Sequence, residues 1–172
     1  MYSLASDEKK ALVMAYTPSM LLRGEAIAKE SVRYSIWMRT DGAPEYIHFL
    51  NVQVLNFVGG QVRPIAYEEM YFPTAQMICF HLVPPAADPM DYDPTEANRV
   101  MVPVTLTVGA FIMKGKVRIS SQINFGISLS TSRIQWMSIY DVDISSPSLP
   151  QMGHFAVPML ILRPSQVLFG MG

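Results

Sequence analysis

Hydrophobic and polar residues alternate along most of this chain, which is the pattern of β-strands that bury one face. The clearest example covers residues 117–130, where Val117, Ile119 and Ile123 point one way and polar residues point the other. This segment predicts one long half-buried strand, or a hairpin bent near Gly126.

Similar alternation predicts further strands in both halves of the chain. These segments cover residues 31–39, 100–108 and 133–144. Residues 46–58 and 76–83 are apolar on both faces, which indicates strands that are covered on both sides. Helical signals are few: residues 6–15 predict one short helix with Ser6 as its N-cap, and residues 67–71 predict a further turn.

The two halves of the chain resemble each other in sequence. The stretch GEAIAKESVRYS, which begins at Gly24, and the stretch GAFIMKGKVRIS, which begins at Gly109, have identical residues at half of their positions. Their offset is 85 residues, and farther along it becomes 90, so that Val52, Val54 and Gln76 recur as similar residues. An internal repeat of this size predicts two copies of one supersecondary unit.

The repeat and the strand pattern together predict an all-β fold. We expect two tandem small antiparallel β-barrel or sandwich units that arose by internal duplication and pack together, with at most one or two short helices. One such unit buries too little surface to be robust alone. The expected parts are an N-terminal arm, a first β unit, a Pro/Asp-rich linker and a second β unit. They span residues 1–22, 23–84, 85–99 and 100–172, respectively.

The composition favours a protein whose outer surface is partly covered. Charged residues make up 16% of the 172 residues, against about 25% in an average soluble domain. The mean hydropathy is +0.22. A chain with so few charges is expected to bury apolar surface against other chains.

The apolar runs of the chain are shorter than the roughly 20 residues that a membrane-spanning helix needs. No signal peptide is recognisable at the N-terminus. We therefore expect no transmembrane segment and a cytoplasmic location. Cys79 is the only cysteine, which excludes an internal disulfide.

Candidate residues for metal binding or catalysis do not form a motif. The acidic stretch from Asp88 to Glu96 lacks the spacing of a calcium loop and is interrupted by prolines. Cys79 and His81 share one face of a strand, but no further cysteine exists to complete a zinc site, and a thiol in an apolar strand is usually inert. We therefore expect no enzymatic activity, no metal and no cofactor.

One candidate interaction face is basic and aromatic. Arg33, Trp37 and Arg39 alternate on one side of the strand expected at residues 31–39, and the repeat places Arg118 at the position equivalent to Arg33. Interleaved basic and aromatic side chains on a small barrel can bind single-stranded nucleic acid. The formal net charge of −1 argues against that partner. We interpret the four residues as a face for contact with another protein or for lateral packing.

The order of a Gly-led strand, a strand with the dipeptide Val-Arg and a closing strand is similar to that of uncharacterised bacterial small β-barrel proteins with an internal duplication. The residues that carry this resemblance are Gly24, Val32, Arg33, Gly109, Val117 and Arg118. The resemblance implies a small β-barrel and no particular activity.

These patterns predict a structural protein that assembles with itself. A homo-oligomer, ring or filament would form through apolar faces, sheet edges and ordered terminal arms, and another structural protein is a further expected partner. The alternative is a regulatory β module. It would bind a small ligand in a groove between the units, or nucleic acid at the face of Arg33, Trp37 and Arg39.

Overall fold

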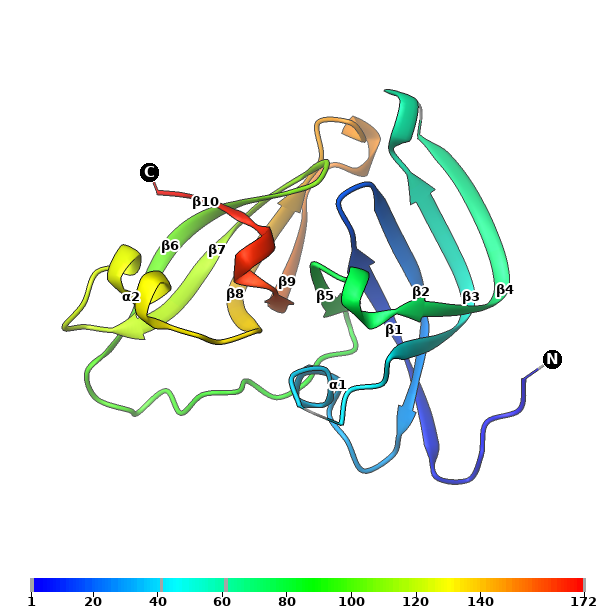
Figure 1. The fold of residues 1–172 in the computed structure, drawn as a ribbon, viewed down its shortest axis with the longest axis horizontal. Helices are drawn as coiled ribbons and strands as arrows, with labels where there is room; N and C mark the ends of the chain where they lie inside the picture. The colour runs from blue at the N-terminus through cyan, green and yellow to red at the C-terminus, as the bar shows by residue number, and fades with distance from the viewer. Residues whose placement is uncertain (1, 41, 61, 172) are drawn as a thin grey trace. The chain divides into compact units, whose positions relative to one another are not determined.

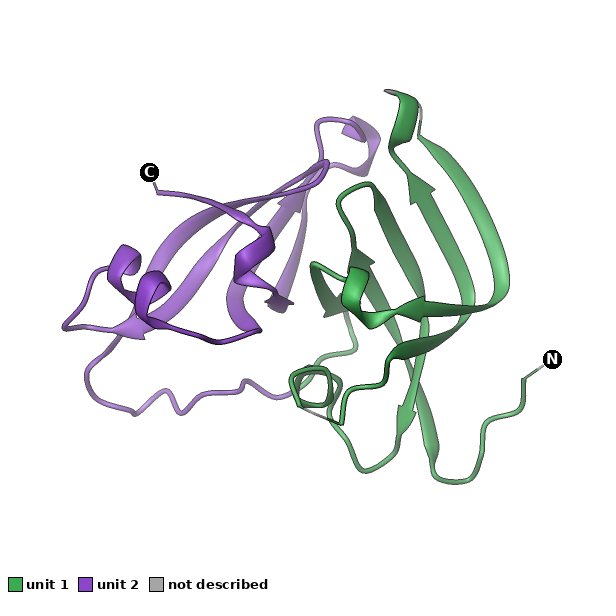
Figure 2. Ribbon diagram, in the orientation of Figure 1, with its two compact units in different colours: residues 1–88 green, residues 89–172 purple. Residues whose placement is uncertain are grey.

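The computed structural model describes residues 2–40, 42–60 and 62–171. The chain forms two compact units, residues 1–88 (unit 1) and residues 89–172 (unit 2), as Figure 2 shows. Both units consist mainly of antiparallel strands with short helices between them, so the predicted all-β class is confirmed.

Unit 1 contains five strands, one short α-helix and two 3-10 turns (Figure 1). The elements are β1 (Glu8–Tyr16), β2 (Met20–Lys29), α1 (Tyr34–Trp37), β3 (Tyr46–Asn56), η1 (Val58–Gly60), β4 (Arg63–Pro73), η2 (Thr74–Gln76) and β5 (Cys79–Leu82). The strands are hydrogen-bonded in the order β5-β1-β2-β3-β4, and every pair is antiparallel.

One face of the unit 1 strands carries the hydrophobic core. Val13, Phe49 and Phe80 come from three different strands and are almost fully buried. Helix α1 packs on this face through Tyr34, whose hydroxyl donates a hydrogen bond to the carbonyl oxygen of Ala26 at 2.9 Å. The helix therefore covers the core side and leaves the opposite face of β1 to β4 without it.

Unit 2 repeats this arrangement. Its elements are β6 (Arg99–Val108), β7 (Phe111–Ser120), α2 (Phe125–Thr131), β8 (Met137–Ser145), η3 (Pro150–Met152), β9 (Phe155–Leu162), η4 (Pro164–Gln166) and β10 (Leu168–Gly170). The strand order is β10-β6-β7-β8-β9, again antiparallel throughout. Leu106, Met113, Ile139 and Leu160 form the centre of its core, and each is fully buried.

The two units share one topology, as an internal repeat would predict. In each unit a hairpin leads to a helix, two further strands follow, and a closing strand pairs with the first strand. The second strand of each unit also meets the third at a β-bulge, located between Arg23 and Glu25 in unit 1 and between Lys114 and Lys116 in unit 2. Bulges of this kind are specific features of a fold rather than defects.

The positions of these bulges show which residues of the two units are equivalent, and they change the alignment of the repeat near Gly24. Gly24 and Gly115 lie at the two bulges, so the equivalent of Gly24 is Gly115. Gly109, which the sequence comparison matched to Gly24, instead lies in the turn between β6 and β7 with a φ of 55°. The later offset of 90 is confirmed, because Asn51 and Asp141 oppose the two glycines with φ values of 52° and 51°.

Three segments differ from the secondary structure that their sequence predicts. Residues 6–15 do not form a helix, because β1 pairs on both sides, with β2 and with β5. Residues 31–39 contain α1 (Tyr34–Trp37) and turns rather than a strand. Residues 117–130 are divided: β7 ends at Ser120, and Asn124 then caps α2 by accepting a hydrogen bond from the N–H of Ile127 at 2.9 Å.

The structure also shows what the segments expected as an arm, a linker and two closed β units contain. The segment predicted as an arm, residues 1–22, contains all of β1, which lies inside the strand order of unit 1. The residues between β5 and β6 are irregular. Neither unit closes its strands into a barrel, because β4 is not adjacent to β5 and β9 is not adjacent to β10 in the strand order.

Candidate functional site

The three residues expected to share a strand face lie around α1 instead. Arg33 is the extended residue before the helix, Trp37 ends the helix, and Arg39 follows it. Trp37 donates from Nε1 to the carbonyl oxygen of Gly42 at 3.2 Å, which fastens the loop after the helix. A helical turn does not place positions i, i+4 and i+6 on one face, so the alternating platform for nucleic-acid bases is not formed.

Arg118 lies on β7 of unit 2 and is neutralised there. Its Nη1 donates to Oε2 of Glu96 at 2.6 Å, and its Nη2 donates to the carbonyl oxygen of Asp93 at 2.9 Å. The guanidinium carbon also lies 4.8 Å from the ring centre of Tyr92. These contacts fasten the linker to β7, so Arg118 has a structural role within unit 2.

The other carboxylates of the linker accept hydrogen bonds within the unit to which each belongs. Asp88 accepts from the backbone N–H of Ser35 at 2.7 Å. Asp91 accepts from the hydroxyls of Ser138 and Tyr140, each at 2.6 Å. Among the described residues, no three His, Cys, Asp or Glu side chains lie together as a metal site would require.

Tyr16 and His81 form a buried polar pair in unit 1. Nδ1 of His81 lies 2.9 Å from the carbonyl oxygen of Leu82, which can only accept, so Nδ1 carries the proton. Nε2 then accepts a hydrogen bond from the Tyr16 hydroxyl at 2.9 Å. Burial lowers the pKa of His81 to about 4 and raises the pKa of Cys79 well above its usual value. Both side chains are neutral near pH 7 and poorly suited to proton transfer or nucleophilic attack.

A groove of about 300 Å³ lies over β1 to β4 of unit 1. Among the described residues that line it, Arg23 and Gln53 are the polar ones, and they are directly opposite each other on β2 and β3. The apolar lining residues are Met14, Leu21, Leu55, Pro64, Ile65 and Ala66. The groove is therefore an apolar surface with one cation and one amide near its middle.

Arg23 has no ion-pair partner among the described residues, unlike two other cations of the unit 1 sheet. Lys10 forms an ion pair with Glu25, and Lys29 with Asp7. No hydrogen bond or ion pair joins Arg23 to any residue in the described part of the chain, and its side chain is exposed. A guanidinium beside apolar side chains, with its donors unused, is a candidate for binding an anionic group.

A second cluster of unit 1 joins aromatic and ionisable side chains. Tyr71 of β4 stacks on His48 of β3 with ring centres 4.6 Å apart, and Tyr2 meets His48 edge-on at 4.5 Å. The Tyr71 hydroxyl donates to Oε1 of Glu69 at 2.9 Å, which lowers the pKa of that carboxyl group. Nε2 of His48 lies 2.8 Å from the same oxygen but outside hydrogen-bond geometry, so the contact is an ion pair only when His48 is protonated.

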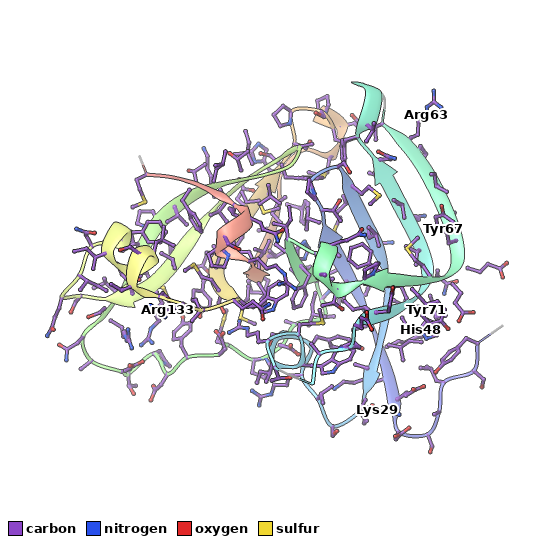
Figure 3. The ribbon with its side chains drawn as sticks, in the orientation of Figure 1. Lys29, His48, Arg63, Tyr67, Tyr71 and Arg133 are labelled. Atoms are coloured by element: carbon purple, nitrogen blue, oxygen red, sulfur yellow. The ribbon has the colours of Figure 1, made fainter. Side chains whose placement is uncertain are left out.

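The outer edge of β4 is the longest open strand edge in unit 1. β4 has 11 residues, stands at the end of the strand order and pairs with β3 alone among the described strands. Ile65, Tyr67 and Tyr71 are 44%, 44% and 60% exposed. Figure 3 shows Arg63, Tyr67 and Tyr71 along this strand, with His48 beside Tyr71.

Comparison of the chain with protein-family models, curated proteins and solved structures found no match. The groove and the strand edge are therefore the features of the molecule that bear on its function. Within the described residues, no helix has the length and apolar character needed to cross a membrane.

Neither the groove nor the β4 edge was predicted from the sequence. Residues 67–71 were expected to form a helical turn, and they belong to β4 instead. The pair of Glu68 and Glu69 interrupts the apolar alternation that would have revealed the strand. The repeat did contain a signal for the groove. Matching Gly24 to Gly115 also matches Arg23 to Lys114. The residues opposite these two cations, Gln53 and Asp143, then differ in charge.

Proposed function

We propose that this protein is a structural protein whose copies assemble through β4, with a second copy of the same chain as the partner. The carrying observation is the open edge of β4. A strand of 11 residues with one unpaired side offers a row of backbone N–H and C=O groups to another strand. Natural proteins usually keep such edges short or cover them.

The side chains of β4 support the same interpretation. Ile65, Tyr67 and Tyr71 present large apolar surfaces to solvent. Aromatic side chains are enriched at protein interfaces because they bury much area and lose little conformational entropy. The low fraction of charged residues in the whole chain, 16%, fits a protein that covers part of its surface by association.

The charges of β4 indicate that its partner is β4 of a second copy. Arg63 is the first residue of the strand, and Glu68 and Glu69 lie at its middle. If two β4 strands paired antiparallel about Ala66, Arg63 of each copy would lie alongside the acidic pair of the other. Ile65 of each copy would lie opposite Tyr67 of the other.

This arrangement has two-fold symmetry and uses the same patch on both chains. A register centred near Glu68 would instead place carboxylates opposite one another, which is unfavourable. Pro64 has no N–H to donate, so it limits how far the ladder extends. The Ala66-centred pairing is therefore the register that the strand favours.

The experiment is sedimentation velocity over a wide range of protein concentration, with the native chain and two variants. Tyr67→Lys places a charge on the proposed edge interface. Tyr46→Lys is the control, because Tyr46 is 52% exposed and lies on β3 rather than on the edge strand. We expect the native chain and Tyr46→Lys to associate and Tyr67→Lys to remain monomeric. A native chain that stays monomeric, or a Tyr67→Lys variant that associates normally, would refute the proposal.

A further inference from the structure

Because the two units share one topology, the groove of unit 1 can be compared with the equivalent positions of unit 2. The bulge register makes Lys114 the equivalent of Arg23 and Asp143 the equivalent of Gln53. In each unit the two residues are directly opposite on neighbouring strands, so their Cβ atoms are about 5 Å apart. Each unit therefore has a cation at this place, but only unit 2 has a carboxylate next to it.

In unit 2 the register neighbour of the cation is a carboxylate, although no ion pair joins Lys114 and Asp143 in the described part of the chain. Asp143 is the register neighbour of Lys114, and its Oδ2 also lies 2.8 Å from Nδ1 of His154. In unit 1 the neighbour is the neutral amide of Gln53, and Arg23 makes no ion pair with the described residues. Unit 1 keeps the cation but lacks the carboxylate that unit 2 has at the opposite position.

We propose that the groove of unit 1 binds a small carboxylate that carries an apolar chain, with its carboxylate on Arg23. The guanidinium can donate two parallel hydrogen bonds to a carboxylate, which a lysine at that position could not do. The Gln53 amide is placed to donate a further hydrogen bond to the same anion. The apolar chain lies against the remaining side chains of the lining, among them Leu21, Leu55 and Ile65.

The size and lining of the groove select this ligand class. A volume of about 300 Å³ is at the lower limit of small-molecule sites, which suits one short acyl chain. None of the lining residues is aromatic, so the groove offers no platform for stacking a nucleobase. A single cation and one amide match one carboxylate, whereas a polyphosphate would require several cations.

The test is calorimetric titration of the full chain with decanoate and, separately, with the uncharged decanamide. Gln53→Asp gives unit 1 the carboxylate that unit 2 already has, and Gln53 is exposed, so this change leaves the core untouched. We expect Gln53→Asp and Arg23→Gln each to weaken decanoate binding by at least about tenfold. Decanamide should bind the native chain and both variants equally weakly.

The matched control is Asp143→Asn, which makes the reverse change at the equivalent position of unit 2 and should leave decanoate binding unchanged. Circular dichroism of each variant establishes that the fold is retained. Equal binding of decanoate to the native chain and to Gln53→Asp would overturn the proposal. So would equal binding of decanoate and decanamide to the native chain, or no binding of decanoate to it. Repeating the titration with Tyr67→Lys separates this result from assembly, because Tyr67 does not line the groove.

Discussion

Gly115 is the residue at which a single added methyl group should have the largest effect on unit 2. It lies on β7 opposite the bulge of β8, which approaches so closely that a Cβ atom would lie 2.6 Å from Cγ2 of Ile139 and 3.1 Å from the carbonyl oxygen of Tyr140. Ile139 is fully buried, and the other contact is to backbone, so neither neighbour can easily give way. The change Gly115→Ala therefore forces strands β7 and β8 apart locally.

Overpacking of this kind costs about 1–3 kcal/mol, and the depth of the overlap favours about 2–3 kcal/mol for Gly115→Ala. In unit 1, Gly24 has a looser environment, since a Cβ there would lie 3.1 Å from Cγ2 of Val52. Gly24→Ala should therefore cost about 1 kcal/mol. The control is Gly126→Ala in α2, where the nearest atom would be 3.5 Å away and alanine is the better helix former.

Trp136 provides the assay, because it is buried in unit 2 and stacks on Arg163, with the guanidinium 4.2 Å from the ring centre. Replacing Trp37, the other of the two tryptophans, by Phe leaves Trp136 as the only tryptophan fluorophore. Urea unfolding followed at this tryptophan then gives the stability of unit 2. A loss for Gly115→Ala no larger than that for Gly126→Ala would refute the close approach of β7 and β8.

Three further changes test other parts of the fold. The free energy of unfolding should fall by up to about 3 kcal/mol between pH 6.5 and pH 4. The reason is that the unfolded chain protonates His81 near pH 6.5, and the folded chain only near its lowered pKa of about 4. Urea unfolding of His81→Gln should lack this part of the pH dependence. Asp91→Ala should lower the free energy of unfolding by about 2 kcal/mol, because it removes the carboxylate that accepts hydrogen bonds from Ser138 and Tyr140. Asp91→Asn should recover part of this loss. Equal losses for the two variants would contradict the hydrogen-bond account. Asn124→Ala should cost about 1 kcal/mol through loss of the α2 cap, and Asn124→Ser should restore most of it in the same Trp136 assay; a neutral Asn124→Ala variant would show that the cap contributes nothing.

The alternation of apolar and polar residues was sufficient to predict the all-β class and most of the long strands. It failed where the same residues also satisfy a helical spacing. Tyr34 and Met38 are four residues apart, and both are buried on the helical segment around α1. In β1, apolar residues at Leu12, Val13 and Met14 obscure the alternation, because Val13 faces the core and Met14 lines the groove on the opposite face.

The groove could not be predicted for a different reason. Arg23 and Gln53 become neighbours only through the pairing of β2 with β3, and that register shifts at the bulge beside Gly24. A one-residue error in register would place the two side chains on opposite faces of the sheet. The similarity of the two halves contained the required information, but the match of Gly24 to Gly109 hid it.

Cysteine cross-linking at Ala66 tests the proposed assembly most directly, because Ala66 would lie opposite itself in the β4 pairing. The control is Ala156→Cys on β9, the position equivalent to Ala66, since β9 contains no charged residues to favour antiparallel pairing with itself. Treated with a short thiol cross-linker, Ala66→Cys should give a covalent dimer at low protein concentration, and Ala156→Cys should remain monomeric. Failure of Ala66→Cys to cross-link, or equal cross-linking of both variants, would contradict assembly through β4.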